Sequence, residues 1–213
     1  MEILRQGVQS EDFNPQASYP YELREEDFAI AMRDVYDFFA DVNGRLAEKG
    51  LGRLEDMVAK ASLSGMLSDM LAASLAKHAR SLTRNCHHNG HPDLIPRDVY
   101  SNDSVQSGDE GVEVKTTVNN GGAVDTHGAR DQWMCVFVYR IDTETQPLVA
   151  REPLRFTEVY LAKVTTDDFR ENKRGPLGTK TATLHRFGLP KLRAGWVYQE
   201  EGAGVPPRSR EAT

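Results

Sequence analysis

The sequence has few cysteines and no long hydrophobic run. Its two cysteines, Cys86 and Cys135, lie far apart and form no CxxC spacing, which argues against a disulfide-stabilised secreted scaffold. No apolar stretch approaches the roughly 20 residues that span a bilayer. Residues 1–13 also lack the apolar core of a signal peptide. We therefore expect a cytoplasmic protein that does not insert into a membrane.

Positive charge is also in deficit. Lysine and arginine number 26 against 32 aspartates and glutamates, which gives a net charge of -6. The excess of acidic residues argues against indiscriminate binding to nucleic acid, but it does not exclude a DNA enzyme whose charges are segregated. The first quarter of the chain is acid-rich, whereas the last quarter is basic. The basic residues that we expect to contact phosphate are Lys180, Arg186, Lys191 and Arg193.

A chain of 213 residues is long enough for one domain with a buried core. The pairs Asn14-Pro15 and Tyr19-Pro20 indicate an extended N-terminal arm over residues 1–21. Residues 22–199 then form a single domain. Residues 200–213, which include Pro206-Pro207, are expected to be a flexible tail.

Helical periodicity predicts two helices in the N-terminal half of the chain. The first begins near Asp27 and ends at Gly50 and Gly52, with an aromatic stripe that forms either core or a dimer face. The second runs over residues 54–82. The pattern further predicts strands at 111–118, 133–141, 156–164 and 195–199, a polar loop at 95–111 and a short capped helix at 166–170. The expected fold class is α/β, with N-terminal helices followed by a central mixed β-sheet flanked by helices.

The strand at 111–118 contains the charged residues around which we expect the functional site to form. Strand alternation places Glu113 and Lys115 on the same face, two residues apart. If Asp93, in the Pro92-Asp93 pair, lies beside them, the site contains two carboxylates and one lysine. Hard divalent cations prefer such oxygen ligands, and hydrolysis of a phosphodiester can use the adjacent lysine.

Pro92-Asp93 and Glu113-x-Lys115 resemble the motif of the PD-(D/E)xK nuclease superfamily, the fold of many restriction endonucleases and DNA-repair nucleases. The resemblance covers the middle of the chain. It implies a restriction-endonuclease-like fold and a Mg²⁺-dependent deoxyribonuclease, with Mn²⁺ as a possible substitute. Asp93, Glu113 and Lys115 would be catalytic, and the backbone carbonyl of Val114 would be a further metal ligand.

In that family the preceding helix often contributes another acid to the metal site. The resemblance makes Asp69 the candidate, with Glu55 as the reserve. Cutting both strands of a duplex normally takes two such sites, so a homodimer bound to DNA is expected. The aromatic first helix is one surface that could join the two subunits.

Four polar residues near the motif are candidates for nucleic-acid contact. His91 lies two residues before Asp93, and on a strand it would share that residue's face. His127, Arg130 and Gln132 follow the catalytic strand, and arginine and glutamine suit contacts to base edges or phosphate. A histidine supporting the site, or an ordinary hydrogen-bonded turn, would explain the same residues.

Two alternatives belong to other functional classes. The first is a catalytically silent nucleic-acid-binding module of the same fold. The second is a zinc-stabilised interaction protein that uses Cys86, His87, His88 and His91. The spacing of these four residues matches no common zinc motif, and no second pair of ligands lies nearby. Occupation of all three acid–acid–lysine positions favours an active nuclease over the silent module.

Overall fold

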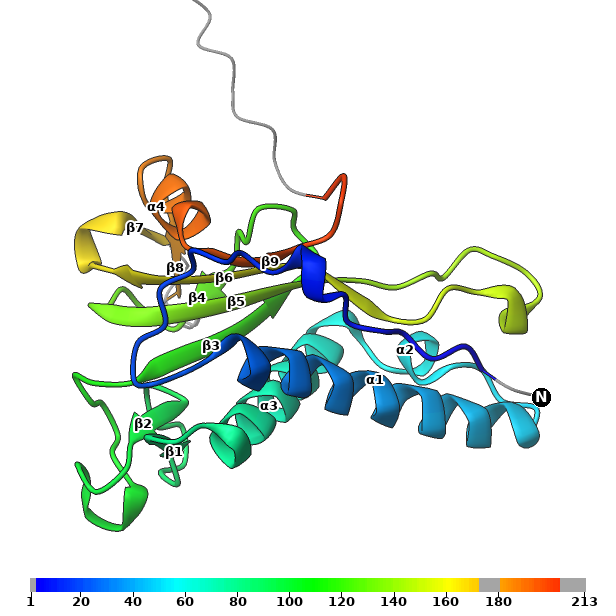
Figure 1. The fold of residues 1–213 in the computed structure, drawn as a ribbon, viewed down its shortest axis with the longest axis horizontal. Coiled ribbons are helices and arrows are strands. Elements are labelled where there is room, and N and C mark those ends of the chain that lie inside the picture. Colours follow the sequence, from blue (N-terminus) through cyan, green and yellow to red (C-terminus); the bar gives the residue numbers. More distant parts are fainter. Residues whose placement is uncertain (1–2, 173–180, 204–213) are drawn as a thin grey trace, which may run out of the picture.

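The computed structural model describes residues 3–172 and 181–203. N-terminal helices precede a six-stranded mixed sheet, and a small antiparallel sheet lies on the side of the large sheet away from the long helices (Figure 1). The expected order of helices followed by a mixed sheet is therefore confirmed. The small sheet was not predicted.

The helices and strands have the following bounds. The helices are α1 (Glu25–Glu48), α2 (Leu54–Met57), α3 (Lys60–His78) and α4 (Gly188–Ala194). The strands are β1 (Leu82–Arg84), β2 (Leu94–Pro96), β3 (Val112–Thr117), β4 (Asp125–Thr126), β5 (Gln132–Arg140), β6 (Arg155–Val164), β7 (Phe169–Asn172), β8 (Thr181–Leu184) and β9 (Trp196–Gln199). Short 3₁₀ turns lie at Ser10–Asp12, Ser101–Asp103, Leu148–Ala150 and Thr166–Asp168.

Helix α1 begins two residues earlier than predicted because Arg24 and Asp27 form a capping box. The Asp27 carboxylate accepts a hydrogen bond from the Arg24 backbone N–H at 2.9 Å and one from its guanidinium at 2.6 Å. The aromatic stripe is core: Phe28 and Phe39 are buried, and Phe28 stacks on Phe137 of β5 at 6.1 Å. This places the stripe against the sheet and not at a dimer face. Phe38 is 39% exposed.

The prediction of one helix over residues 54–82 is wrong in two respects: the helix is interrupted, and it ends before residue 82. Val58 and Ala59 are extended, with ψ angles of 146° and 143°, and they separate α2 from α3. The buried leucine stripe starts only at Leu63, so the apolar periodicity supports α3 and not the residues before it. Helix α3 ends at His78, and Leu82 already belongs to β1.

The large sheet has the strand order β1-β2-β3-β5-β6-β9. Strands β3 and β5 are parallel, and the other neighbouring pairs are antiparallel. Strand β5 is buried on both faces because Cys135 and Phe137 join the core under α1 and α3, whereas Met134 and Val136 join a second core. Its near-continuous apolar sequence is typical of such a strand.

The second core lies under the small sheet and α4. The strand order there is β4-β8-β7, all antiparallel (Figure 1). The short capped helix predicted at 166–170 is a single 3₁₀ turn whose capping box joins Thr165 and Asp168, and Phe169 already begins β7. Residues 173–180, which include the predicted phosphate contact Lys180, lie outside the described residues.

The N-terminal segment packs along the last strand of the large sheet. Phe13 is buried, and its ring meets that of Tyr198 edge-on at 5.0 Å. The Asn14 backbone N–H donates to the Val197 carbonyl at 2.9 Å, and its side chain donates to the Trp196 carbonyl at 2.9 Å. The predicted tail falls largely on residues 204–213, outside the described residues. None of the helices in the described part of the chain has the length and hydropathy needed to cross a bilayer.

Candidate active site

Strand β3 presents its two charged residues on the face opposite α1 and α3. Val112 and Val114 join the core under these helices, and the Thr116 hydroxyl on the same face donates to the Ser64 carbonyl of α3 at 2.7 Å. Alternation therefore turns Glu113 and Lys115 to the other face. Lys115 Nζ lies 2.5 Å from Glu113 Oε1, which makes a short ion pair along one strand.

Asp93 reaches the same place from the neighbouring hairpin. It immediately precedes β2, which pairs with β3 through Leu94 and Val112. Its Oδ2 accepts the Val114 backbone N–H at 2.8 Å and lies 3.7 Å from Lys115 Nζ. The structure thus brings Asp93, Glu113 and Lys115 together in one cluster.

His91 joins this cluster through the buried glutamate. Its Nδ1 lies 3.3 Å from Glu113 Oε2 and, because a carboxylate only accepts, that nitrogen carries the proton. The His127 ring lies 6.2 Å from the His91 ring, at the edge of the same site. Residues 91–93 come before β2, so His91 and Asp93 meet around Glu113 by loop geometry and not by sharing a strand face.

Burial and the neighbouring charges both shift the pKa values of Glu113, Asp93 and Lys115. Burial works to raise the pKa of Glu113, but the His91 hydrogen bond and the Lys115 charge outweigh it and lower that pKa to about 2. Burial and then the Glu113 charge raise the pKa of Asp93. Burial works to lower the pKa of Lys115, yet the charges of Glu113 and Asp93 raise it. Lys115 is therefore a cation at neutral pH.

The cluster opens into a cleft of about 710 Å³. The Lys115 side chain is 19% exposed and that of Asp93 is 32% exposed, whereas Glu113 is nearly fully buried at 2%. Asp69 of α3 lines the cleft too, but its Oδ1 pairs with Arg84 at 3.0 Å. Glu55, the reserve acid, does not line this cleft: it is buried beside Arg53 and accepts a hydrogen bond from Asn43.

The donor set suits magnesium better than a transition metal. Among the described residues, no group of three or more His, Cys, Asp and Glu side chains is placed to hold a metal ion. Magnesium is usually held by one or two carboxylates and keeps several waters, and Asp93 and Glu113, both beside Lys115, match it in ligand type and number. Burial and then the Glu113 charge raise the pKa of Asp93, and a divalent cation bound between the two carboxylates would act in the opposite direction and favour the charged form.

The Cys86–His91 cluster does not assemble as a zinc site in the described residues. The exposed Cys86 Sγ contacts the Arg84 carbonyl at 3.7 Å, and the His87 ring bonds the His88 carbonyl at 2.8 Å. His87 and His88 instead line the wall of the cleft. Structural zinc needs four convergent ligands, which this loop does not bring together.

Of the other predicted nucleic-acid contacts within the described residues, only His127 lines the cleft. His127 is exposed and lines the cleft, and Arg130 donates to the His127 carbonyl at 2.9 Å. Gln132 is only 8% exposed at the start of β5, so burial separates it from a nucleic-acid surface. The basic residues near α4 do not line the cleft and are engaged locally, in the following contacts: Lys191 with Asp168 at 2.7 Å, Arg193 with the Gly121 carbonyl at 2.9 Å, and Arg186 over the Phe187 ring at 4.6 Å.

Asn85 organises the loops of the cleft, and the sequence analysis did not identify it. Its side-chain nitrogen donates to the Pro92 carbonyl at 3.0 Å and the Val105 carbonyl at 2.8 Å. Its side-chain oxygen accepts the backbone N–H groups of His87 and Val105, both at 3.1 Å. A lone asparagine carries no motif, and these partners come from two separate loops, β1–β2 and β2–β3.

Comparisons of the chain with protein-family models, with curated proteins and with solved structures find no match.

Proposed function

We propose that the chain is a Mg²⁺-dependent deoxyribonuclease of the PD-(D/E)xK type, which hydrolyses DNA phosphodiester bonds. The observation that supports this most directly is the convergence of Asp93, Glu113 and Lys115 within ion-pair distance, in a cleft open to solvent. Asp93 and Glu113 would hold the metal, with the Val114 carbonyl as the ligand that the family resemblance implies, and Mn²⁺ could take its place. A bound divalent cation would lower the pKa of a coordinated water and offset charge on the phosphate.

The protein's own residues would orient the reactants. Lys115 stays protonated beside two carboxylates, so it would place a positive charge next to the phosphoryl oxygens and would not act as a base. His91 would hold Glu113 in position through its Nδ1–H donor. His127 lies on the exposed rim of the cleft, where it could contact the DNA backbone.

The test is cleavage of supercoiled and linear DNA with Mg²⁺ or Mn²⁺. The panel should include modified and phage DNA, because a site-specific enzyme can ignore a single plasmid. Lys115→Ala and Asp93→Ala should each reduce cutting by at least about 100-fold, because the first removes a positive charge beside the reacting phosphate and the second removes a ligand of the metal. Lys77→Ala and Asp109→Ala are matched controls, because both residues are exposed and neither lines the cleft.

Three outcomes distinguish a nuclease that uses this site, cutting that does not depend on this site, and a silent binding module. Metal-dependent cutting that is lost in both site variants and kept in both controls supports the nuclease. Cutting that survives in Lys115→Ala and Asp93→Ala contradicts this site. Intact DNA binding without cutting on any substrate favours the silent binding module of the same fold.

A further inference from the structure

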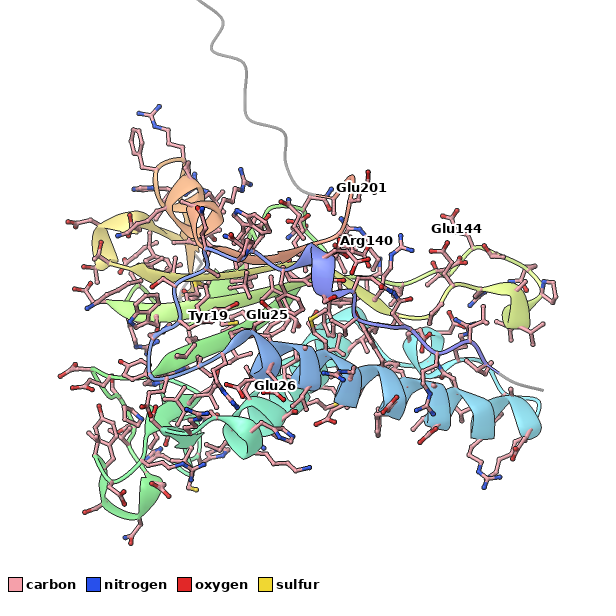
Figure 2. The ribbon with its side chains drawn as sticks, in the orientation of Figure 1. Tyr19, Glu25, Glu26, Arg140, Glu144 and Glu201 are labelled. Atoms are coloured by element: carbon pink, nitrogen blue, oxygen red, sulfur yellow. The ribbon has the colours of Figure 1, made fainter. Side chains whose placement is uncertain are left out.

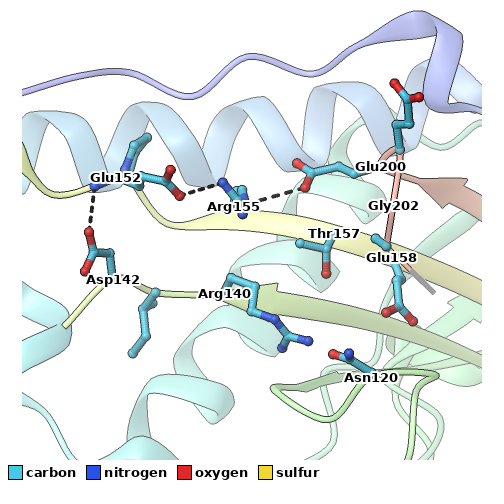
Figure 3. Close-up of a pocket in the computed structure, with 13 residues that line it drawn as sticks. Asn120, Arg140, Asp142, Glu152, Arg155, Thr157, Glu158, Glu200 and Gly202 are labelled. Carbon is cyan, nitrogen blue, oxygen red and sulfur yellow. Dashed lines mark hydrogen bonds and ion pairs between the residues drawn. The ribbon is translucent and has the colours of Figure 1, made fainter. Parts of the chain in front are cut away.

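A second cavity lies at the opposite end of the large sheet from the nuclease cleft. Glu113 pairs with Met134 near the start of β5, whereas this cavity opens beside Arg140 at the end of β5. It measures about 400 Å³, which is within the usual size range of small-molecule sites. Figure 3 shows Arg140, Thr157 and Glu158 around it, and Figure 2 shows Arg140 and Glu201 on the same side of the molecule.

A β-bulge directs two residues of β6 toward this cavity. Val138 pairs with Glu158 and Tyr139 pairs with Phe156, so Thr157 is the extra residue between them. Thr157 is only 5% exposed and lines the cavity, yet its hydroxyl has no hydrogen-bond partner. An unpaired buried hydroxyl costs free energy, so its position at a cavity wall points to a ligand.

Glu158 supplies a second acceptor at the cavity wall. Its residue is 1% exposed, and its Oε2 accepts the Gly121 backbone N–H at 2.7 Å and the Tyr160 hydroxyl at 2.5 Å. No hydrogen bond from the described residues reaches Oε1. Burial and then this carboxylate raise the pKa of Tyr160, so the phenol remains a donor. One oxygen of a buried carboxylate is thus left for a partner from the cavity.

Three of the other carboxylates around the cavity, Asp142, Glu152 and Glu200, already have partners. Arg155 binds Glu152 at 2.6 Å and lies 3.4 Å from Glu200, and Asp142 accepts backbone N–H groups of its own loop. Arg140 donates to the Val118 carbonyl at 2.5 Å. Five carboxylates and two guanidinium groups line the cavity, so its charge is negative and favours a cation.

The chemistry of the walls defines the kind of cation. None of the described residues lining the cavity is aromatic, and aromatic faces are what recognise quaternary ammonium groups. Glu158 Oε1 and Thr157 Oγ1 instead offer acceptor lone pairs, which suit a group with several N–H donors. We propose that this cavity binds a small molecule bearing a primary ammonium group, which donates to Glu158 and Thr157. The proposal is independent of nuclease activity.

Calorimetric titration of the full-length chain, without DNA, tests the proposal. The probes are 1,4-diaminobutane, ethanolamine and free lysine, with tetramethylammonium as the cation that has no N–H donor. Thr157→Val keeps the side-chain shape and should weaken amine binding by roughly fivefold to tenfold, the effect of one lost hydrogen bond. Glu158→Gln should weaken it by roughly 10- to 100-fold, because a charge-assisted bond is lost. Glu144→Gln is the matched control, since Glu144 lies farther out on the loop (Figure 2) and does not line the cavity.

Thr157→Val also keeps the test informative if Glu158→Gln does not fold. Because the Thr157 hydroxyl has no protein partner, its removal should leave the melting temperature of the ligand-free protein unchanged or higher. Selective loss of amine binding in a stably folded Thr157→Val would support the site. Failure of the parent chain to bind any of the three amines would overturn it. So would equal binding of tetramethylammonium, or unchanged amine affinity in Thr157→Val.

Discussion

Gly111 determines how closely the hairpin that carries Asp93 approaches β3. Its φ of +133° belongs to glycine, and a Cβ at this position would lie 2.1 Å from the Leu94 carbonyl oxygen. The Gly111 N–H also donates to the Tyr21 hydroxyl at 2.9 Å, which connects the N-terminal segment to the same point. The distance between Asp93 and Lys115 therefore depends on a residue that has no side chain.

Gly111→Ala should destabilise the protein by several kcal/mol, because it adds a backbone clash to a strained φ. Gly128→Ala is the matched control: Gly128 also has a positive φ, +95°, but a Cβ there meets nothing within 4 Å. Its cost should be about 1 kcal/mol, the conformational part alone. Chemical denaturation of both variants measures the difference. Equal costs would mean that the close approach to Leu94 is relaxed easily.

The sequence predicted Glu113 and Lys115 as neighbours because alternation along one strand is a local property. It also identified Asp93 by the resemblance. It did not predict that His91 would donate to Glu113, because that contact depends on how the 85–93 loop folds back over β3. Gln132 was misjudged for a related reason: its polarity suggested a contact surface, whereas its place at the start of a doubly covered strand buries it.

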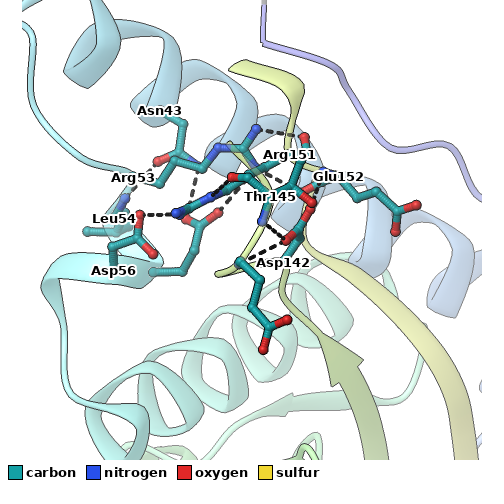
Figure 4. Close-up of polar contacts among 10 residues, drawn as sticks. Asn43, Arg53, Leu54, Asp56, Asp142, Thr145, Arg151 and Glu152 are labelled. Carbon is teal, nitrogen blue, oxygen red and sulfur yellow. Dashed lines mark hydrogen bonds and ion pairs between the residues drawn. The ribbon is translucent and has the colours of Figure 1, made fainter. Parts of the chain in front are cut away.

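The loop between β5 and β6 is held to the N-terminal helices by a network of buried arginines (Figure 4). Arg53 donates to the carbonyls of Arg151 and Glu152, both at 2.8 Å, and Arg151 pairs with Asp56 at 2.6 Å. Within the loop, Asp142 accepts the backbone N–H groups of Glu144, Thr145 and Glu152. These bonds to the charged carboxylate lower the pKa of Asp142 below 3.8.

Asp142→Ala should therefore destabilise the protein in a pH-dependent way. The charged carboxylate contributes stability above the unfolded pKa of 3.8, and the contribution decreases as the pH falls toward the lower folded value. The melting temperatures of parent and variant should differ more at pH 7 than at pH 3. Glu144→Ala, an exposed neighbour, should show little difference at either pH. A gap of equal size at both pH values would mean that Asp142 acts through packing and not through its charge.

Elements with strong, long patterns were predictable, whereas short ones were not. Strand β5 has nine residues with a near-continuous apolar sequence, and the prediction was correct to within one residue at each end. Strands β4, β7 and β8 have two to four residues each and form only by pairing with one another, so no periodicity marks them. The break between α2 and α3 was missed because neither glycine nor proline marks it.

At the scale of the whole molecule, the proposed nuclease should act as a homodimer. Phe28 and Phe39 of the α1 stripe are buried in the core, so these two side chains are not available to a second subunit. Gel filtration with light scattering should give twice the 23.8 kDa monomer mass, with DNA if not without it. The same preparation should convert supercoiled DNA to linear form without accumulating a nicked product. A monomer mass under both conditions would exclude paired cutting by two joined sites.

The pairing of residues 13–14 with β9 has a consequence for synthesis on the ribosome. Strand β9 covers the outer edge of β6, and the N-terminal segment then covers β9. Neither layer can form until residues 196–199 have emerged from the ribosome. Phe13, whose ring packs on Tyr198, therefore stays without this partner until β9 has emerged. Such long-range closure slows folding and leaves the nascent chain dependent on protection from aggregation until its last strand is in place.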